Sequence, residues 1–231
     1  MTGHHPTIIP YDTNTTVLAA AELLLNASEV NPSLRNIPEF KYDIVDVTRQ
    51  VLVNRFIDLY INLIAVYNSS SSASDVSMAG AQLVQLADDL DELLYTDENF
   101  LLSTWVEDAR QWAEEGCQVD AAYAAYLEFS ARNQLTLWGP NGEINDYASK
   151  QWAGLVGEYY SKRWDMFVQY LVHLKKSGEA YNDSIIAEQL LNFGQEWQDP
   201  ARHQREVVLL GHAGTRGNTL DVVRAVLQTW T

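Results

Sequence analysis

The sequence predicts an all-α fold, an irregular multi-helix bundle of about seven to eight helices. Apolar residues recur at steps of three and four through most of the chain, which is the spacing of one helix face. No stretch alternates polar and apolar residues as strands do, and Gly, Pro, Asn and Ser separate the periodic segments. Apolar residues make up 47% of the 231 residues, enough for a core in one large domain or two small ones.

The N-terminal part is predicted to hold a short helix and then a long one. Leucines and alanines lie at helical spacing from Thr16 to Ala27, after a possible cap at Thr15 or Thr16. Two prolines, Pro32 and Pro38, mark a loop. From Phe40 to Tyr67 the apolar positions are numerous enough to predict contacts on two sides of one long helix.

A serine-rich connection at 68–74 separates this helix from three more, predicted over 75–95, 97–115 and 119–137. The inward face of the first of these is predicted to comprise Met78, Leu83, Leu86, Leu90 and Leu93. Its four carboxylates, Asp88, Asp89, Asp91 and Glu92, point in divergent directions along a helix. They therefore favour a solvated face over a metal site.

One long aromatic-rich helical segment is predicted from Asp146 to about His173, with its aromatic residues mainly in the core. Gly178 is expected to end it. Two last helices are predicted over 182–197 and 218–230. Between them, Val207 to Leu210 fits either a short strand or a packed loop.

Composition excludes several classes of function. The formal net charge of −16 argues against binding to nucleic acid or to an anionic membrane surface. No apolar run is long enough for membrane insertion, and residues 1–10 do not resemble a signal peptide. No phosphate-binding loop, dinucleotide fingerprint or zinc spacing occurs, so we expect no cofactor and no metal. The single cysteine, Cys117, cannot form an internal disulfide.

Four asparagines stand in Asn-X-Ser/Thr sequons: Asn14, Asn26, Asn68 and Asn182. They are candidate glycosylation sites if the chain enters a secretory pathway. Chance alone would give fewer than four sequons in a chain of this length, so their number mildly favours a secreted protein.

The most informative stretch is a tight connection around Trp138. Gly139-Pro140 ends the preceding helix, Asn141-Gly142 is a turn dipeptide, and Asn145 or Asp146 is a possible cap of the next helix. Trp138 is therefore expected at the tip of an interhelical turn. There it is either a platform for a sugar or partner, or a packing anchor.

Two groups of charged residues have competing interpretations. Glu143 and Asp146 form a conceivable catalytic pair, but helix capping explains them more simply. Asp43 and Asp46 share a helix face, and Arg49 follows Asp46 by three, so an intrahelical ion pair is expected. Such a pair usually has no chemical role; the alternative is a polar seam toward another domain.

Several motifs together resemble one known family. They are Tyr42-Asp43-Ile44-Val45-Asp46-Val47-Thr48-Arg49-Gln50, Phe100-Leu101-Leu102 with Trp105 and Ala109-Arg110, the run from Arg132 to Pro140, Asp146-Tyr147-Ala148, Lys150 to Val156, Tyr159-Tyr160, Arg163-Trp164, and Gly217 to Asp221. In this order they resemble the C-terminal helical region of the α-N-acetylglucosaminidase family of glycoside hydrolases. The resemblance extends from about residue 40 to the C-terminus. Family members have a proline near Ser161, which is absent here, so we expect no sharp kink there.

The resemblance implies that this chain supports catalysis without performing it. The catalytic glutamates of the family lie on an upstream barrel domain, and no residue here matches them. Trp138 would offer an apolar wall to a terminal α-linked N-acetylglucosamine, and Tyr147, Arg132 and, more weakly, Asn133 would bind substrate near the pocket mouth. Tyr42, Asp43, Asp46, Arg49 and Arg163 would have structural or interdomain roles.

The implied organisation is a linking segment with the first short helix at 1–39 and an all-α C-terminal domain at 40–231. The implied partners are the barrel domain of the same polypeptide and an N-acetylglucosamine-terminated glycan, which is heparan sulfate in animal members. The implied localisation is secreted, lysosomal or vacuolar. The alternative is a stand-alone helical interaction or carbohydrate-binding module without catalysis.

Overall fold

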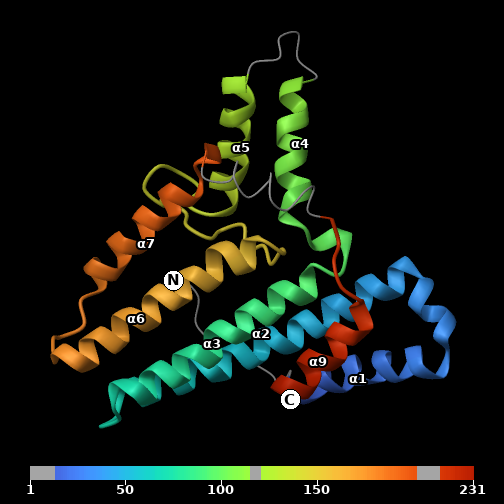
Figure 1. Ribbon diagram of the computed structural model, residues 1–231, viewed down its shortest axis with the longest axis horizontal. Helices are drawn as coiled ribbons and strands as arrows, with labels where there is room; N and C mark the ends of the chain where they lie inside the picture. Colours follow the sequence, from blue (N-terminus) through green and yellow to red (C-terminus); the bar gives the residue numbers. More distant parts are fainter. Residues whose placement is uncertain (1–13, 115–120, 202–213) are drawn as a thin grey trace.

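The computed structural model describes residues 14–114, 121–201 and 214–231, and within them the protein is all-α, as predicted (Figure 1). The elements are, in order, α1 (Asn14–Val30), the 3₁₀-helix η1 (Pro32–Asn36), α2 (Pro38–Asn68), α3 (Ala73–Leu94), the 3₁₀-helix η2 (Glu98–Phe100), α4 (Leu102–Glu114), α5 (Ala121–Leu135), the π-helix η3 (Val156–Ser161), α6 (Lys162–Ser177), α7 (Asp183–Trp197) and α9 (Thr219–Trp230). The predictions for Cys117 and for Val207 to Leu210 lie outside the described residues.

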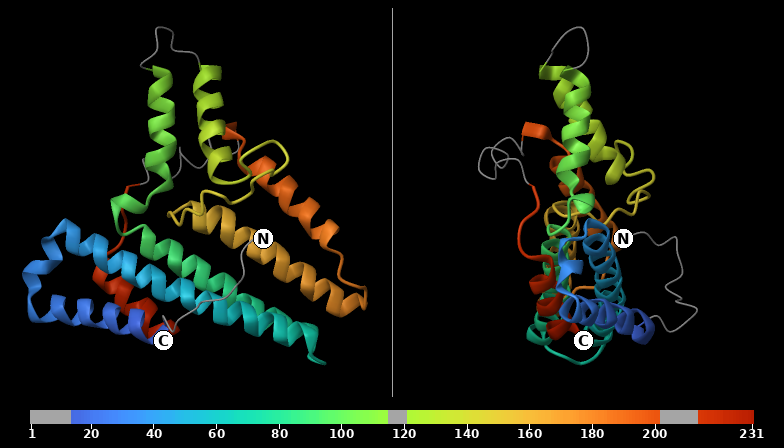
Figure 2. Two further views of the ribbon diagram at one scale, coloured as in Figure 1. Left: turned by 180° about the vertical axis from the view of Figure 1, so that it is seen from behind. Right: turned by 90° about the vertical axis from the view of Figure 1, so that its right-hand side faces the viewer.

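The long helices α2 and α3 lie side by side and form the centre of the molecule (Figure 1). Helix α6 packs on α3, and α7 packs on α6. Helices α1 and α9 pack against α2, with α9 also reaching α3. Helices α4 and α5 pair with each other and project from this body in all views (Figures 1 and 2).

Local signals account for several helix ends. Pro38 occupies the first turn of α2, where its missing N–H leaves no helical hydrogen bond unmade. Ser72 and Asp75 form a capping box at the start of α3. Asn182 and Asn218 cap α7 and α9, each accepting a hydrogen bond from the backbone of the first turn. Gly178 ends α6 in the left-handed conformation with φ of 75°.

Two hydrophobic clusters hold the fold. The larger one fills the space between α2, α3 and α6, with leucines such as Leu52, Leu83 and Leu171 almost completely buried. The smaller one contains Leu102, Val106, Leu135, Leu155, Tyr159 and Trp197. It joins the base of the α4–α5 hairpin to the π-helix and to the end of α7. The described part of the chain is therefore one body with an attached hairpin.

The prediction that Met78 faces inward is wrong. Its side chain is 60% exposed, whereas Val76, Leu83, Leu86 and the later leucines of α3 are buried. Val76 continues the buried stripe toward the N-terminus, and Met78 lies out of phase with that stripe. Helix α3 therefore begins its buried face at Val76.

The aromatic-rich helix also begins later than predicted. Residues 146–154 form turns and irregular backbone, with an isolated bridge between Ala153 and Leu101, and helical structure starts at Leu155. Asp146 and Ser149 have φ of 59° and 49°, and Gly154 has φ of 86°, values in the left-handed region that a right-handed helix does not contain. A π-helix, Val156–Ser161, then leads into α6. The buried apolar residues of the irregular segment and of the π-helix recur at intervals like those of one continuous α-helix, and this spacing explains the early predicted start.

The carboxylates of α3 do not form a solvated face, contrary to prediction. Asp91 accepts hydrogen bonds at 2.8 Å from the backbone N–H groups of both Gly154 and Gly157. Asp88 accepts one at 2.5 Å from the Ser161 hydroxyl. Asp89 accepts another at 2.7 Å from the Trp230 indole, and Glu92 is exposed. The carboxylates of α3 thus fasten the π-helix and α9 to α3.

No helix in the described ranges is long and apolar enough to cross a membrane. Among the same residues, no group of three or more His, Cys, Asp and Glu side chains is arranged to hold a metal ion.

Candidate functional site

The connection after α5 is held in a tight turn by Asn133. Its Nδ2 donates to the Gly139 carbonyl at 3.1 Å, and its Oδ1 accepts from the Gly139 N–H at 2.9 Å. The Trp138 N–H donates to the Asn133 carbonyl at 2.7 Å, and Nδ2 also donates to Gln198 Oε1 at the end of α7. Both polar atoms of the Asn133 side chain therefore bond within the protein, and they fix the position of Trp138.

The backbone of this turn adopts conformations that few residues accept. Trp138 has φ of 46° and Gly139 has φ of 145°. A left-handed conformation costs a non-glycine residue about 1 to 2 kcal/mol, so the surrounding contacts must impose it on Trp138. The N–H of Asp146 closes the base of the loop by donating to the Thr136 carbonyl at 2.7 Å. Hydrogen bonds therefore hold the loop at both of its ends.

This loop carries an exposed aromatic and aliphatic surface. The Trp138 and Tyr147 rings meet edge to face at 5.6 Å between centroids. Trp138 is partly buried, while Tyr147 is 72% exposed and Ile144 on the same loop is 46% exposed. The sequence analysis did not identify Ile144. It could have been found as an apolar residue that stands inside a polar turn and belongs to no helical repeat. Trp138 therefore packs on its neighbour and also contributes to the surface.

A buried ion pair anchors the far end of the loop. Nη1 of Arg163 on α6 lies 2.8 Å from both carboxylate oxygens of Asp146. Arg163 is 7% exposed, and its guanidinium carbon lies 4.8 Å from the centroid of the Tyr159 ring. Asp146 thus pairs with α6 and caps no helix, contrary to the expectation for this residue. Because Tyr147 follows Asp146 directly, Arg163 also positions Tyr147.

Glu143 also lacks the helix-start position that the sequence suggested. Its carboxylate accepts hydrogen bonds from the backbone N–H and the side-chain amide of Asn141, at 3.0 and 3.2 Å. The hydrogen bond from the Asn141 N–H, the largest cause, lowers the pKa of Glu143 from its usual value. Glu143 therefore stabilises the turn as a carboxylate, whereas a catalytic acid needs a raised pKa.

Arg132 lies inside the protein, away from the exposed loop surface. It is 5% exposed and donates to Glu128 at 2.9 Å, and Glu128 also pairs with Arg110 from α4 at 2.5 Å. Its guanidinium carbon lies 4.9 Å from the centroid of the Trp197 ring. Burial lowers the pKa of Arg132, but arginine remains protonated in proteins. These are the contacts of a residue that joins α4, α5 and α7.

The charged face at the start of α2 connects to the same loop. Arg49 pairs with Asp46 at 2.6 Å, the intrahelical pair expected from the sequence, and also donates to Gln151 Oε1. Asp43 is exposed, and Tyr42 stacks on Phe100 at 5.1 Å between centroids. The face thus lies next to residues 146–151 and is partly open to solvent.

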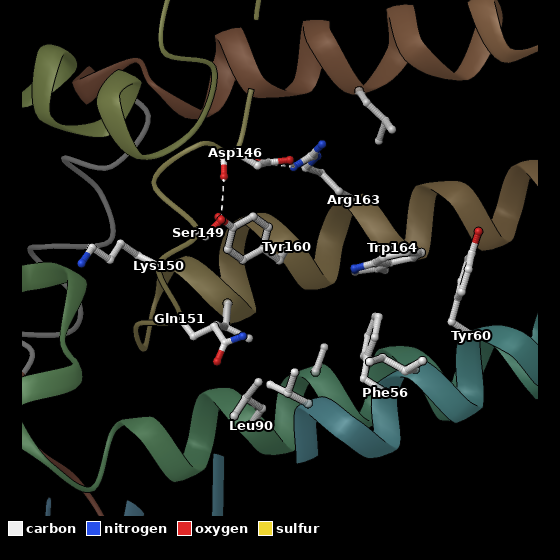
Figure 3. A pocket seen from close by; sticks show the side chains of 15 residues that line it. Phe56, Tyr60, Leu90, Asp146, Ser149, Lys150, Gln151, Tyr160, Arg163 and Trp164 are labelled. Carbon is white, nitrogen blue, oxygen red and sulfur yellow. Dashed lines mark hydrogen bonds and ion pairs between the residues drawn. The ribbon is translucent and has the colours of Figure 1, made fainter. Parts of the chain in front are cut away.

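A cleft of about 480 Å³ opens beside this loop, between α6 and α2 (Figure 3). Its walls include Phe56 and Tyr60 from α2, Tyr160 from the π-helix and Trp164 from α6. Asp146, Ser149, Lys150 and Gln151 line it on the side of the loop. The loop therefore borders two surfaces, the exposed one around Tyr147 and the cleft.

Three of the four sequon asparagines are exposed: Asn26 in α1, Asn68 at the end of α2, and Asn182 before α7. Asn14 is the first residue of α1.

Comparisons with known proteins agree with the resemblance. The profile of the family described as "Alpha-N-acetylglucosaminidase (NAGLU) C-terminal domain" matches residues 2–229. The human protein named alpha-N-acetylglucosaminidase is 43% identical over 157 residues, which are 68% of this chain and 20% of that protein. Two structures of a family 89 glycoside hydrolase from Clostridium perfringens, one with PUGNAc and one with 2-acetamido-1,2-dideoxynojirmycin, are also similar. Each matches with a TM-score of 0.80 and 22% identity, over 97% of this chain and 24% of theirs.

This chain spans between a fifth and a quarter of the length of those relatives, and the structural match confirms the fold. The family profile covers nearly the whole chain, and residues 132–164, which carry several of the sequence motifs, form the tight turn, the buried ion pair and the π-helix described above. The chain therefore belongs to the family of alpha-N-acetylglucosaminidase (NAGLU) C-terminal domains.

Proposed function

We propose that this domain completes the substrate pocket of an α-N-acetylglucosaminidase, working with a catalytic barrel domain to remove terminal α-linked N-acetylglucosamine from glycans. The observation that carries the proposal is the exposed surface of Trp138, Ile144 and Tyr147 on a loop fixed by Asn133 and Arg163. Apolar and aromatic surface of this kind suits the carbon-bound face of a pyranose and its acetyl methyl group. A fixed loop also lowers the entropic cost of holding them.

The proposed division of labour fits the chemistry of the loop carboxylates. A retaining glycosidase needs two carboxyl groups about 5 to 5.5 Å apart, one of them with a raised pKa. Here Asp146 is paired with Arg163, and Glu143 has a lowered pKa. Both are better suited to holding the loop than to acid catalysis, so we assign the reacting carboxylates to the barrel domain.

The first test is hydrolysis of an aryl α-N-acetylglucosaminide. The isolated chain is expected to be inactive, and a chimera in which it replaces the matching region of the human relative is expected to be active. Robust turnover by the isolated chain would overturn the proposed division between domains. Thermal unfolding of the chimera separates a misfolded chimera from an inactive one.

Within the chimera, Trp138→Ala and Tyr147→Ala are expected to lower kcat/KM about tenfold to a hundredfold, which corresponds to about 1 to 3 kcal/mol of lost contact. The matched controls are Trp112→Ala and Tyr126→Ala, because those rings on the α4–α5 hairpin are 62% and 61% exposed. Equal effects at the loop and at the hairpin would show that the loop does not contact substrate.

We further propose that the full protein follows a secretory route to a secreted, lysosomal or vacuolar location. The exposed positions of Asn26, Asn68 and Asn182 support glycosylation there. Mass spectrometry of the protein from a eukaryotic secretory host tests this, and unmodified asparagines at all three positions would count against it.

A further inference from the structure

The cleft between α2 and α6 has one aromatic end. Phe56 and Tyr60 reach up from α2 and Trp164 reaches down from α6, so that the Trp164 ring meets the other two (Figure 3). The Trp164 ring meets Phe56 at 5.0 Å and Tyr60 at 5.6 Å between centroids, edge to face in both cases. Edge-to-face packing leaves parts of each ring face open to the cleft, which provides flat apolar surface.

The other end of the cleft is polar. Asp146, Ser149 and Tyr160 lie together there (Figure 3). The Asp146 carboxylate accepts from Arg163, and since each oxygen has more than one acceptor site, both keep capacity for a further hydrogen bond. No hydrogen bond among the described residues engages the Tyr160 hydroxyl. Burial raises the pKa of Tyr160 above its usual value, so this hydroxyl remains a neutral donor.

This combination matches the chemistry of a sugar ring. A pyranose presents carbon-bound hydrogens on its faces, which pack on aromatic rings, and hydroxyl groups at its edge, which both donate and accept hydrogen bonds. The cleft volume of about 480 Å³ lies in the range of small-molecule sites, about 300 to 1,000 Å³. The Asp146–Arg163 pair carries no net charge, and the one further charged residue in the lining, Lys150, is exposed, so a neutral ligand meets no unpaired buried charge in the cleft.

The position of the cleft suggests which sugar it holds. Asp146 lines the cleft, and the next residue, Tyr147, is 72% exposed on the loop surface that we assign to the terminal N-acetylglucosamine. A single loop therefore separates the two surfaces. We propose that the cleft is a second carbohydrate subsite, which binds the pyranose next to the terminal sugar of the glycan; this assignment rests on the proposed function.

The test is titration of the 231-residue chain, labelled with ¹⁵N, with methyl β-D-glucopyranoside. The indole N–H signal of Trp164 is expected to shift in a saturable way. Ile57→Phe places a larger side chain on the α2 wall of the cleft and is expected to weaken binding about tenfold or more, the factor for about 1.4 kcal/mol. Ile61→Phe is the matched control, because Ile61 lies one turn further along α2, outside the cleft and 58% exposed.

A second variant covers the case in which Ile57→Phe disturbs folding, as judged by circular dichroism. Tyr160→Phe removes one hydroxyl and is expected to weaken binding about fivefold. Absence of a saturable shift, or equal weakening by Ile61→Phe, would overturn the subsite. Tighter binding of free N-acetylglucosamine than of the glucoside would assign the cleft to the terminal sugar instead. Trp138→Ala is expected to leave this titration unchanged, so its effect on hydrolysis tests the proposed function separately.

Discussion

The buried pair of Arg163 and Asp146 connects α6 to the loop that carries Trp138 and Tyr147. Arg163→Met would leave a largely buried carboxylate without its cation, and we expect it to lower the free energy of unfolding by about 3 kcal/mol. Urea denaturation of the chain measures this. Arg224→Met is the control, since Arg224 is more exposed and its pairs with Asp221 and Glu29 span 3.2 Å; a loss below about 1 kcal/mol is expected.

The double variant Arg163→Met with Asp146→Asn should recover part of the loss, because it removes the uncompensated charge. If Arg163→Met costs no more than Arg224→Met, the pair does not hold the loop.

Asp91 makes the stability of the fold depend on pH. Burial, the largest cause, raises the pKa of Asp91 from 3.8 to about 6, although hydrogen bonds from Gly157 and Gly154 oppose the shift. Because the pKa is higher in the folded state, protonation of Asp91 stabilises the fold. This contribution is complete below about pH 3.8 and is lost as the pH rises through about 6. The fold should therefore gain on the order of 1 kcal/mol from this group between pH 7.5 and pH 5.

Asp91→Asn should remove this pH dependence while keeping the acceptor for both glycine N–H groups, since both donate to the same oxygen. Urea denaturation at pH 5 and pH 7.5 measures the difference. Asp108→Asn on the exposed face of α4 makes the same change in net charge and serves as the control. An equal change in pH dependence in the two variants would mean that the net charge, not Asp91, sets it.

At the scale of elements, the packing of α6 on α3 depends on a glycine. A Cβ at Gly80 would lie 2.2 Å from Cγ1 of Val168, far inside contact distance. In an exposed helix, Gly→Ala stabilises by up to about 1 kcal/mol. Here we expect Gly80→Ala to destabilise by about 1 to 3 kcal/mol, as overpacking does.

The measurement is a double-mutant cycle with Val168→Ala, in which the methyl groups that oppose Gly80 are removed. The pair should be less destabilised than the two single changes added together, by about 1 kcal/mol or more. Additive effects would indicate that the two helices can move apart at this point.

The π-helix shows why an element with the apolar pattern of an α-helix takes another form. The spacing of Leu155, Val156, Tyr159 and Tyr160 fits a helix, and each of these side chains is at least partly buried. Contacts with α3 accompany the π-helical form. Asp91 accepts hydrogen bonds from the N–H groups of Gly154 and Gly157, and Asp88 accepts one from the Ser161 hydroxyl. These contacts connect residues more than 60 positions apart, so the local spacing of apolar residues cannot indicate them.

At the scale of the whole molecule, the two hydrophobic clusters differ in size and position. The larger one lies between α2, α3 and α6, whereas the smaller one lies at the base of α4 and α5. Helices α4 and α5 contact mainly each other (Figure 1). Native-state hydrogen exchange is therefore expected to show lower opening free energies for amides of α4 and α5 than for those of α2 and α3. Equal opening free energies in α4 and α5 and in α2 and α3 would indicate that the hairpin opens only with global unfolding.

The sequence by itself determined the fold class and most helices. The long α2, the C-terminal end of α6, the helices α7 and α9, and the turn at Trp138 all followed from apolar spacing and from proline, glycine and asparagine signals. Such signals act within about one turn of a helix, so they can be read without knowing the neighbours. The family resemblance also followed from the sequence, because its motifs are contiguous runs of residues.

The tertiary structure alone decided how the polar residues are used. Arg132 and Trp138 lie six positions apart in one motif, yet the first is buried against Trp197 and the second reaches the surface beside Tyr147. The pairing of Asp146 with Arg163 and the late start of the aromatic helix depend in the same way on neighbours supplied by other helices. A helix face can be inferred from spacing, but a polar group's partner depends on which helix packs against it, and only the folded chain brings those groups together.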